Sequence, residues 1–117
     1  MQYMLLIYGN EDQPEPAPGT PAFDAYMEPW MTYTEELREA GVMVAGEALQ
    51  PSLTASCVRM APGGRQVQDG PFVDSKDQLS GFYMIDVPSL DEAIEWAAKC
   101  PGAREGTMEV RPIMVFG

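Results

Sequence analysis

Hydrophobic residues in this chain gather into short runs separated by polar, proline-rich and glycine-rich segments. Four runs are too short for buried helices and rich in strand formers, so they predict strands at residues 2–8, 42–45, 53–60 and 81–87. Residues 65–68 resume the pattern after Pro62-Gly63-Gly64. This turn signal predicts a β-hairpin whose return strand ends near Asp69.

Two other segments repeat apolar residues at the spacing of an amphipathic helix. The first follows Thr20-Pro21, a cap with an N1 proline, and is expected to kink or split at Pro29. The second begins at Ser89, which forms a capping box with Glu92, and ends at Pro101-Gly102. Each predicted helix therefore lies between two predicted strands.

Prolines mark two further segments. Residues 11–20 carry three prolines and three acidic residues with little to bury, so we expect an extended, mobile loop. We interpret it as a spacer, with the cover of a pocket as the alternative. A last strand is predicted at residues 108–116, where Pro112 removes a backbone donor and favours an edge or a bulge.

This order predicts one α+β domain over residues 1–117, a ferredoxin-like βαββαβ subunit with an inserted β-hairpin. Two helices cover only one face of such a sheet. The strands are nevertheless apolar on both faces, so the second face needs a partner. We expect a homodimer, a dimeric α+β barrel in which two sheets pack face to face and bury on the order of 800 Å² per subunit.

The net charge of −11 narrows the expected partners. Seven basic residues against eighteen acidic ones argue against nucleic acid and membrane surfaces, because binding there depends on clustered Lys and Arg. No apolar run approaches the ~20 residues of a spanning helix. The first ten residues also lack the basic start of a signal peptide. We therefore expect a soluble, unprocessed cytoplasmic protein.

The chain has two cysteines and no histidine. Cys57 and Cys100 show no CxxC spacing, so a metal site is not predicted. We interpret them as buried free thiols, with a disulfide as the alternative. Glycine-rich nucleotide loops and hydrolase motifs are also missing from the sequence, so no cofactor is expected.

Ionisable groups are densest at residues 69–76, Asp-Gly-Pro-Phe-Val-Asp-Ser-Lys. Gly70 and Pro71 constrain the backbone, so Asp69 and Phe72 should point in defined directions from a tight bend. A carboxylate held there among other carboxylates makes Asp69 the candidate catalytic acid or base. The alternative is that Asp69 caps its own turn through backbone N–H groups.

Five further side chains are candidates for ligand binding: Glu47, Phe72, Asp74, Lys76 and Tyr83. Most have a structural alternative. Asp74 and Lys76 could form an exposed ion pair, and Phe72 could anchor the turn to the core. Glu47 could face solvent or one of three arginines, Arg59, Arg65 or Arg111. Tyr83, like Tyr33, is a candidate proton donor that would need help from its surroundings.

Several motifs together resemble the YCII-related, DGPF-domain family. They are Asp69-Gly-Pro-Phe72, Lys76, Gly81-Phe82, the helix at residues 91–97, Pro101, Glu109-Val-Arg-Pro112 and the segment at residues 46–51. They follow the family's order across essentially the whole chain. The resemblance implies a dimeric α+β barrel with a small pocket in each subunit near the DGPF turn.

The resemblance leaves the activity open. Enzymatic roles in the wider family rest on a His and Asp pair, and without histidine only the aspartate half, best matched by Asp69, carries over. Asp74 and Asp77 stand where family members commonly have the longer glutamate. DGPF proteins are also often associated with extracytoplasmic-function sigma factors.

We therefore expect a small dimeric protein that binds a small polar molecule near the DGPF turn, with cofactor-free carboxylate acid–base chemistry as an extension of that role. Two alternatives stay open. One is a regulatory module that works with a sigma factor, and the other is a pseudo-enzyme that keeps the barrel without the histidine.

Overall fold

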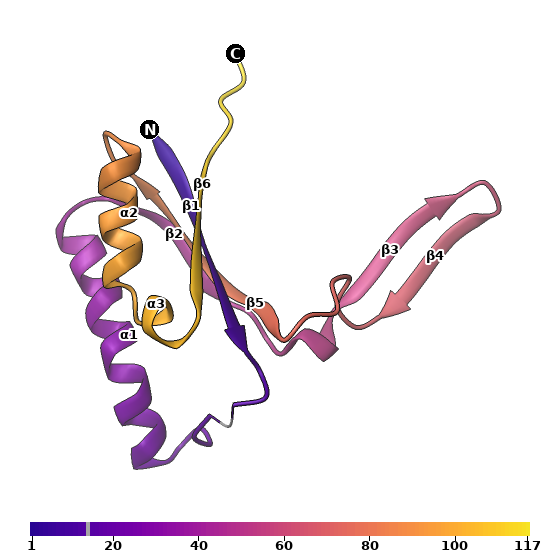
Figure 1. Ribbon diagram of the computed structural model, residues 1–117, viewed down its shortest axis with the longest axis horizontal. Coiled ribbons are helices and arrows are strands. Elements are labelled where there is room, and N and C mark those ends of the chain that lie inside the picture. The colour runs from indigo at the N-terminus through magenta and orange to yellow at the C-terminus, as the bar shows by residue number, and fades with distance from the viewer. Residues whose placement is uncertain (14) are drawn as a thin grey trace.

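The computed structural model describes residues 1–13 and 15–117. Figure 1 shows a helical layer against an antiparallel sheet, with a separate hairpin projecting from the sheet. The four strands of the sheet lie in the order β2-β5-β1-β6, with bounds β1 (Gln2–Asn10), β2 (Met43–Ala48), β5 (Asp77–Asp86) and β6 (Thr107–Pro112). This arrangement, with helices between β1 and β2 and between β5 and β6, confirms the predicted ferredoxin-like α+β fold.

Helix α1 (Pro21–Glu39) begins where the sequence predicts. The Thr20 hydroxyl accepts a hydrogen bond from the backbone N–H of Phe23 at 3.2 Å, and Pro21 occupies the first turn. The helix continues past Pro29 as one element. The chain is therefore not split at that proline.

Helix α2 (Leu90–Lys99) is capped by Ser89, whose hydroxyl accepts a hydrogen bond from the backbone N–H of Glu92 at 3.3 Å. Cys100 then adopts an extended conformation, and Pro101 opens a further short helix, α3 (Pro101–Glu105). The sequence predicted only a helix end here. Proline ends one helix and suits the first turn of the next, so the same signal fits both outcomes.

The predicted hairpin is confirmed. A 3-10 turn, η1 (Ser52–Thr54), precedes β3 (Ser56–Ala61), which pairs with β4 (Gly64–Asp69) around the two-residue turn Pro62-Gly63. Strand β3 starts later than expected because η1 occupies the first residues of the apolar run. We call β3, β4 and their turn the arm.

The core lies between the sheet and the helices. Alternate residues of two central strands face the helices and are buried: Tyr3, Leu5 and Ile7 on β1, and Tyr83 and Ile85 on β5. They pack with Tyr33 and Leu37 from α1 and with Ala93 and Ala97 from α2. Cys100 is fully buried in this cluster, whereas Cys57 is partly buried, and both are free thiols.

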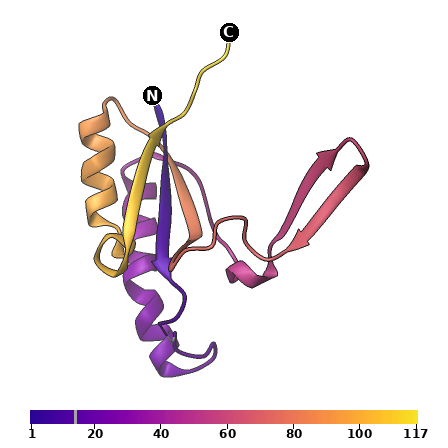
Figure 2. The ribbon, with the colours of Figure 1, turned by 45° about the vertical axis from the view of Figure 1, so that its right-hand side comes forward.

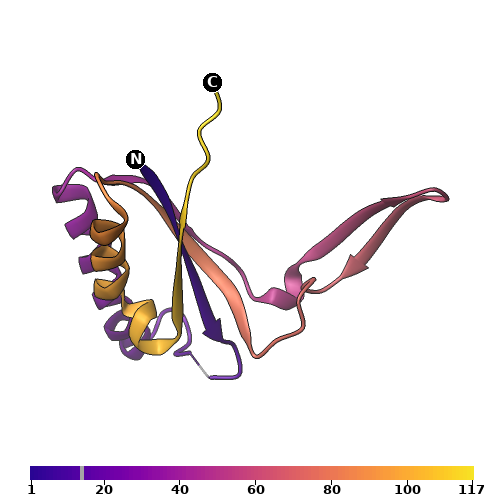
Figure 3. The same cartoon turned by 45° about the horizontal axis from the view of Figure 1, so that its top comes forward.

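The opposite face of the sheet has no helix over it in the described part of the chain (Figure 2). Its central strands present apolar side chains that are only partly buried: Met4 and Leu6 on β1, paired with Met84 and Phe82 on β5. We call this surface the open face. The arm leaves the sheet on the same side, away from the helices (Figures 2 and 3).

Two further predictions concern the proline-containing segments at residues 108–116 and 11–20. Strand β6 is an edge strand, as predicted, but it ends at Pro112 and residues 113–117 leave the sheet. The loop at residues 11–20 holds no helix or strand in its described residues, and Pro14 lies outside them. The Glu11 carboxylate accepts hydrogen bonds from the backbone N–H of Ser52, at 2.8 Å, and from its hydroxyl. This contact ties the loop to η1.

None of the described helices has the length and apolar character needed to cross a bilayer. Residues 1–13 and 15–117 also contain no group of three His, Cys, Asp or Glu side chains arranged to hold a metal ion.

Candidate functional site

A groove of about 520 Å³ lies between α1 and the β2–β5 side of the sheet. Pockets for small molecules commonly measure roughly 300 to 1,000 Å³. Helix α1 lines this groove with Trp30, Thr34 and Arg38, and the sheet lines it with Gly46, Gly81 and Tyr83. We call it the α1–β2 groove.

The three α1 residues share one side of the helix because they are spaced four apart. The Thr34 hydroxyl lies 3.0 Å from the Trp30 carbonyl, to which it donates, and 2.8 Å from the Tyr83 hydroxyl. Since Thr34 has one hydroxyl proton and gives it to Trp30, Tyr83 is the donor in the second bond. Among the described residues no group donates to the Tyr83 oxygen, which can therefore accept a hydrogen bond.

The Tyr83 ring is held in place by its packing in the core. It packs edge-on against Tyr33, with centroids 5.3 Å apart and planes at 77°. Tyr33 is itself fixed because its hydroxyl donates to the Trp96 carbonyl at 2.8 Å. Burial raises the pKa of Tyr83 above its usual value, although the hydrogen bond with Thr34 opposes the shift. Tyr83 therefore stays protonated at neutral pH and serves as a hydrogen-bonding group rather than as a base.

Two glycines make room for this arrangement. A Cβ atom at Gly46 would lie 2.8 Å from Cδ1 of Tyr83, and one at Gly81 would lie 2.8 Å from the carbonyl oxygen of Glu47. Any larger residue would displace the Tyr83 ring in the first case and separate β2 from β5 in the second. The glycines thus preserve the inner wall of the groove.

Tyr26 and Glu15 also line the groove. The Tyr26 hydroxyl lies 3.4 Å from Glu15 Oε1 and 3.3 Å from Glu105 Oε2. Burial, helped by the negative charges of Glu105 and Glu15, raises the pKa of Tyr26 to about 12. The contact brings the loop before α1 and the short helix α3 to the same phenol.

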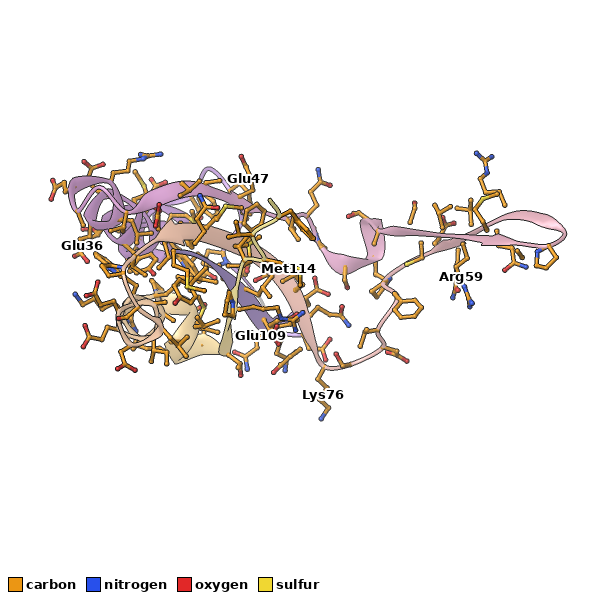
Figure 4. All side chains as sticks on the ribbon, turned by 90° about the horizontal axis from the view of Figure 1, so that it is seen from above. Glu36, Glu47, Arg59, Lys76, Glu109 and Met114 are labelled. Atoms are coloured by element: carbon orange, nitrogen blue, oxygen red, sulfur yellow. The ribbon has the colours of Figure 1, made fainter. Side chains whose placement is uncertain are left out.

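Two of the residues predicted from the sequence, Glu47 and Tyr83, line the groove. Glu47 pairs with Phe82, so its exposed side chain lies on the opposite face of the sheet from Tyr83. Figure 4 shows Glu47 projecting outward from β2. Of the arginines considered as its partner, Arg111 instead forms an ion pair with Glu109 at 2.8 Å.

The other predicted residues, Asp69, Phe72, Asp74 and Lys76, are exposed on the segment from the end of β4 to the start of β5 and do not line the groove. Phe72 is 80% exposed, so it does not anchor the turn in the core of the subunit. Lys76 points into solvent in Figure 4, and no ion pair joins it to Asp74 within the described residues. Their roles in binding or catalysis stay predictions.

The turn at Asp69 is fastened by backbone groups. The Gly70 N–H donates to the Ala55 carbonyl at 2.7 Å, and the Cys57 thiol donates to the Gly70 carbonyl at 3.2 Å. Over residues 1–13 and 15–117, no hydrogen bond to the Asp69 carboxylate is formed, so that side chain does not cap its own turn.

Sequence reasoning did not single out Thr34 and Arg38 as site residues. The available signal was their spacing of four and eight residues from Trp30, which places two polar groups on the stripe of a tryptophan. That signal is weak, because the strand opposite the stripe is known only once the chain has folded.

Comparisons with known proteins agree along the whole chain. The family model of the YCII-related domain matches residues 1–117. An uncharacterized protein of Rhizobium meliloti (strain 1021) is 34% identical over 118 residues, covering 99% of this chain and 94% of that protein. With the fold, the Asp69–Phe72 turn and the full-length match in agreement, this chain belongs to the YCII-related family.

Proposed function

We propose that this protein is a homodimer that binds a small amphipathic molecule in the α1–β2 groove of each subunit. The observation that carries the proposal is the partly buried Tyr83–Thr34 hydroxyl pair, which lies in the wall of a groove of about 520 Å³. Apolar walls with a few fixed polar groups are characteristic of small-molecule sites.

The walls define the kind of ligand. Trp30, Met27 and Met31 offer an aromatic surface and flexible thioethers for an apolar body. The hydroxyl pair offers a hydrogen bond to a polar group, and Arg38 and Glu35 supply charges at the α1 wall. A molecule with an apolar body and one hydrogen-bond donor fits these features.

Binding is better supported than catalysis. The Tyr83 phenol is held protonated by burial, and Asp69, the candidate acid or base, does not line the groove of its own subunit. Carboxylate acid–base chemistry is therefore a separate proposal. Its test is the Asp69→Asn variant, which should abolish turnover of any substrate identified for the protein, and unchanged turnover would refute it.

The binding proposal is tested by thermal-shift screening of the wild type against a metabolite library. Thr34→Val removes the hydroxyl that pairs with Tyr83 while keeping the side chain's shape, so it should abolish most of a ligand-induced shift. Thr32→Val makes the same change on the exposed side of α1 and should keep the full shift. Equal shifts in both variants, or none in the wild type across the library, would overturn the proposal.

The homodimer is supported by the open face. Met4, Leu6, Phe82 and Met84 lie there, and no helix of residues 1–13 or 15–117 covers them. Monomeric proteins seldom leave such contiguous apolar surface exposed. Sedimentation of the wild type at micromolar concentration should give a dimer, and a monodisperse monomer would contradict this part of the proposal.

A second candidate function is a regulatory module for another protein, such as a sigma factor. It is supported by the apolar segment after β6, where Met114, Val115 and Phe116 are 73%, 82% and 86% exposed. The tagged protein should then capture a sigma factor from cell extract at moderate salt. Recovery of its own dimer alone would count against this function.

A further inference from the structure

The arm has almost no support from its own subunit. Its two strands form a sheet of their own that does not join the main sheet. Figure 1 shows it standing away from both layers of the body. Isolated two-stranded hairpins are only marginally stable in water, so an arm of this length needs a surface to pack against.

One face of the arm is apolar. Val58 pairs with Val67, and Met60 pairs with Arg65, so these four side chains share a face. Val58, Met60 and Val67 are 60%, 77% and 56% exposed. The other face carries Gln66, Gln68 and Arg59, the last of which is labelled on the arm in Figure 4. We call the first of these the apolar arm face.

The extended shape of the subunit leaves the apolar arm face exposed. The radius of gyration is 16.4 Å and the dimensions are 50 × 47 × 20 Å. A compact chain of this length would have a radius of gyration of about 13 Å. The excess comes from an arm and a C-terminal segment that extend from a thin body, as Figures 1 and 3 show.

The arm also differs from the body in charge. It carries two arginines and one aspartate, a net charge of +1 in a chain of net charge −11, so the rest of the chain carries −12. A cationic, apolar surface is attracted to an acidic one. The arm stands away from the acidic body of its own subunit. The body of a second molecule of the same kind offers such an acidic surface.

We infer that the arm clasps a second copy of this chain, with the apolar arm face packed on the partner subunit. The open face and the arm project to the same side of the sheet, so one two-fold pairing covers both surfaces at once (Figure 2). Each arm then packs on a surface of the partner subunit. The positive charge of the arms partly offsets the repulsion between the two acidic bodies. This inference rests on the homodimer of the proposed function and adds the element that holds it together.

The test compares the dimer dissociation constants of wild type and variants by sedimentation equilibrium. Val58→Ser, Met60→Ser and Val67→Ser together remove the apolar arm face and should raise the dissociation constant about 100-fold or more. The matched control is Ala61→Ser, Gln66→Ser and Gln68→Ser, on the opposite face. It should dimerise like the wild type. Circular dichroism of both variants checks that the body still folds.

Charge gives a second measurement that does not disturb the apolar residues. Arg65→Glu should weaken the dimer at least tenfold at low ionic strength, with a smaller effect at high salt. Arg104→Glu makes the same change of charge on α3, in the helical layer, and should have little effect.

The outcomes separate the two proposals. A wild-type dimer that is weakened in both arm variants supports the clasp. A wild-type dimer that neither variant weakens overturns the clasp and leaves the sheet-to-sheet dimer standing. A monomeric wild type overturns both the clasp and the homodimer, and leaves the ligand proposal for the groove to its own thermal-shift test.

Discussion

Tyr83 serves the core with its ring and the groove with its hydroxyl. The ring packs edge-on against Tyr33, and the hydroxyl bonds to Thr34. Because one end of the side chain is fixed by packing, the other end is presented to the groove in a single orientation. For the ligand binding proposed above, this pre-organisation would lower the entropy lost on binding.

A substitution at Gly46 tests whether the orientation of Tyr83 depends on the room that this glycine leaves beside its ring. Gly46→Ala would place a methyl group 2.8 Å from Cδ1 of Tyr83, so we expect a loss of about 1–3 kcal/mol in the free energy of unfolding. Gly9→Ala is the control, because a Cβ there meets nothing within 4 Å. Urea denaturation measures both. Equal stabilities would show that the Tyr83 ring yields without cost.

Cys100 predicts a pH dependence of stability. Burial raises the pKa of its thiol from 9.0 to about 11, so the unfolded chain loses the thiol proton first as the pH rises. Native stability should therefore fall between about pH 9 and about pH 11. Cys100→Ala should show a smaller fall in melting temperature across this window than the wild type. An unchanged fall in Cys100→Ala would refute the assignment.

At the scale of elements, α1 contributes side chains both to the core and to the groove. Tyr33 and Leu37 enter the core, whereas Trp30, Thr34 and Arg38 line the groove. The two sets are offset around the helix, so a rotation of α1 would disturb both. The helix therefore links the stability of the core to the shape of the groove.

The start of α2 offers an element-scale prediction. Ser89→Ala removes the acceptor for the Glu92 N–H and should cost about 1 kcal/mol of unfolding free energy. Ser89→Asp keeps an acceptor and adds a favourable charge at the helix N-terminus, so it should match or exceed the wild type. Thermal or urea unfolding of the three proteins decides the point, and a Ser89→Asp variant as unstable as Ser89→Ala would contradict it.

At the scale of the whole molecule, apolar surface is distributed unevenly. The helices seal one face of the sheet, and the open face and the arm leave apolar groups on the other side (Figure 3). Apolar surface left on one side of the sheet in this way is the feature that the proposed dimer would cover.

The substitution Leu6→Lys tests the proposed dimer through a change in the main sheet. The side chain lies in the middle of the open face, so a charge there should shift the sedimentation equilibrium strongly toward monomer. Leu90→Lys introduces the same charge at a leucine that is 46% exposed on α2 and should keep the dimer. A Leu6→Lys protein that dimerises like the wild type would place the interface elsewhere.

Local signals in the sequence predicted most of the fold. Thr20 and Ser89 cap the helices they were expected to cap, and Pro112 lies on an edge strand. These signals act over a few residues, so they do not depend on the rest of the chain. The candidate site was predicted less completely, because the dense motif at residues 69–76 is exposed at the base of the arm.

The sequence by itself determined the strands, the two longer helices and their order, because capping, turn chemistry and hydrophobic period are properties of neighbouring residues. Only the tertiary structure decided that Thr34 meets Tyr83, 49 positions away along the chain, and that Gly46 makes room for both. It also decided that the arm stands clear of its own subunit. Such contacts depend on how separate elements pack in space, which no local pattern specifies.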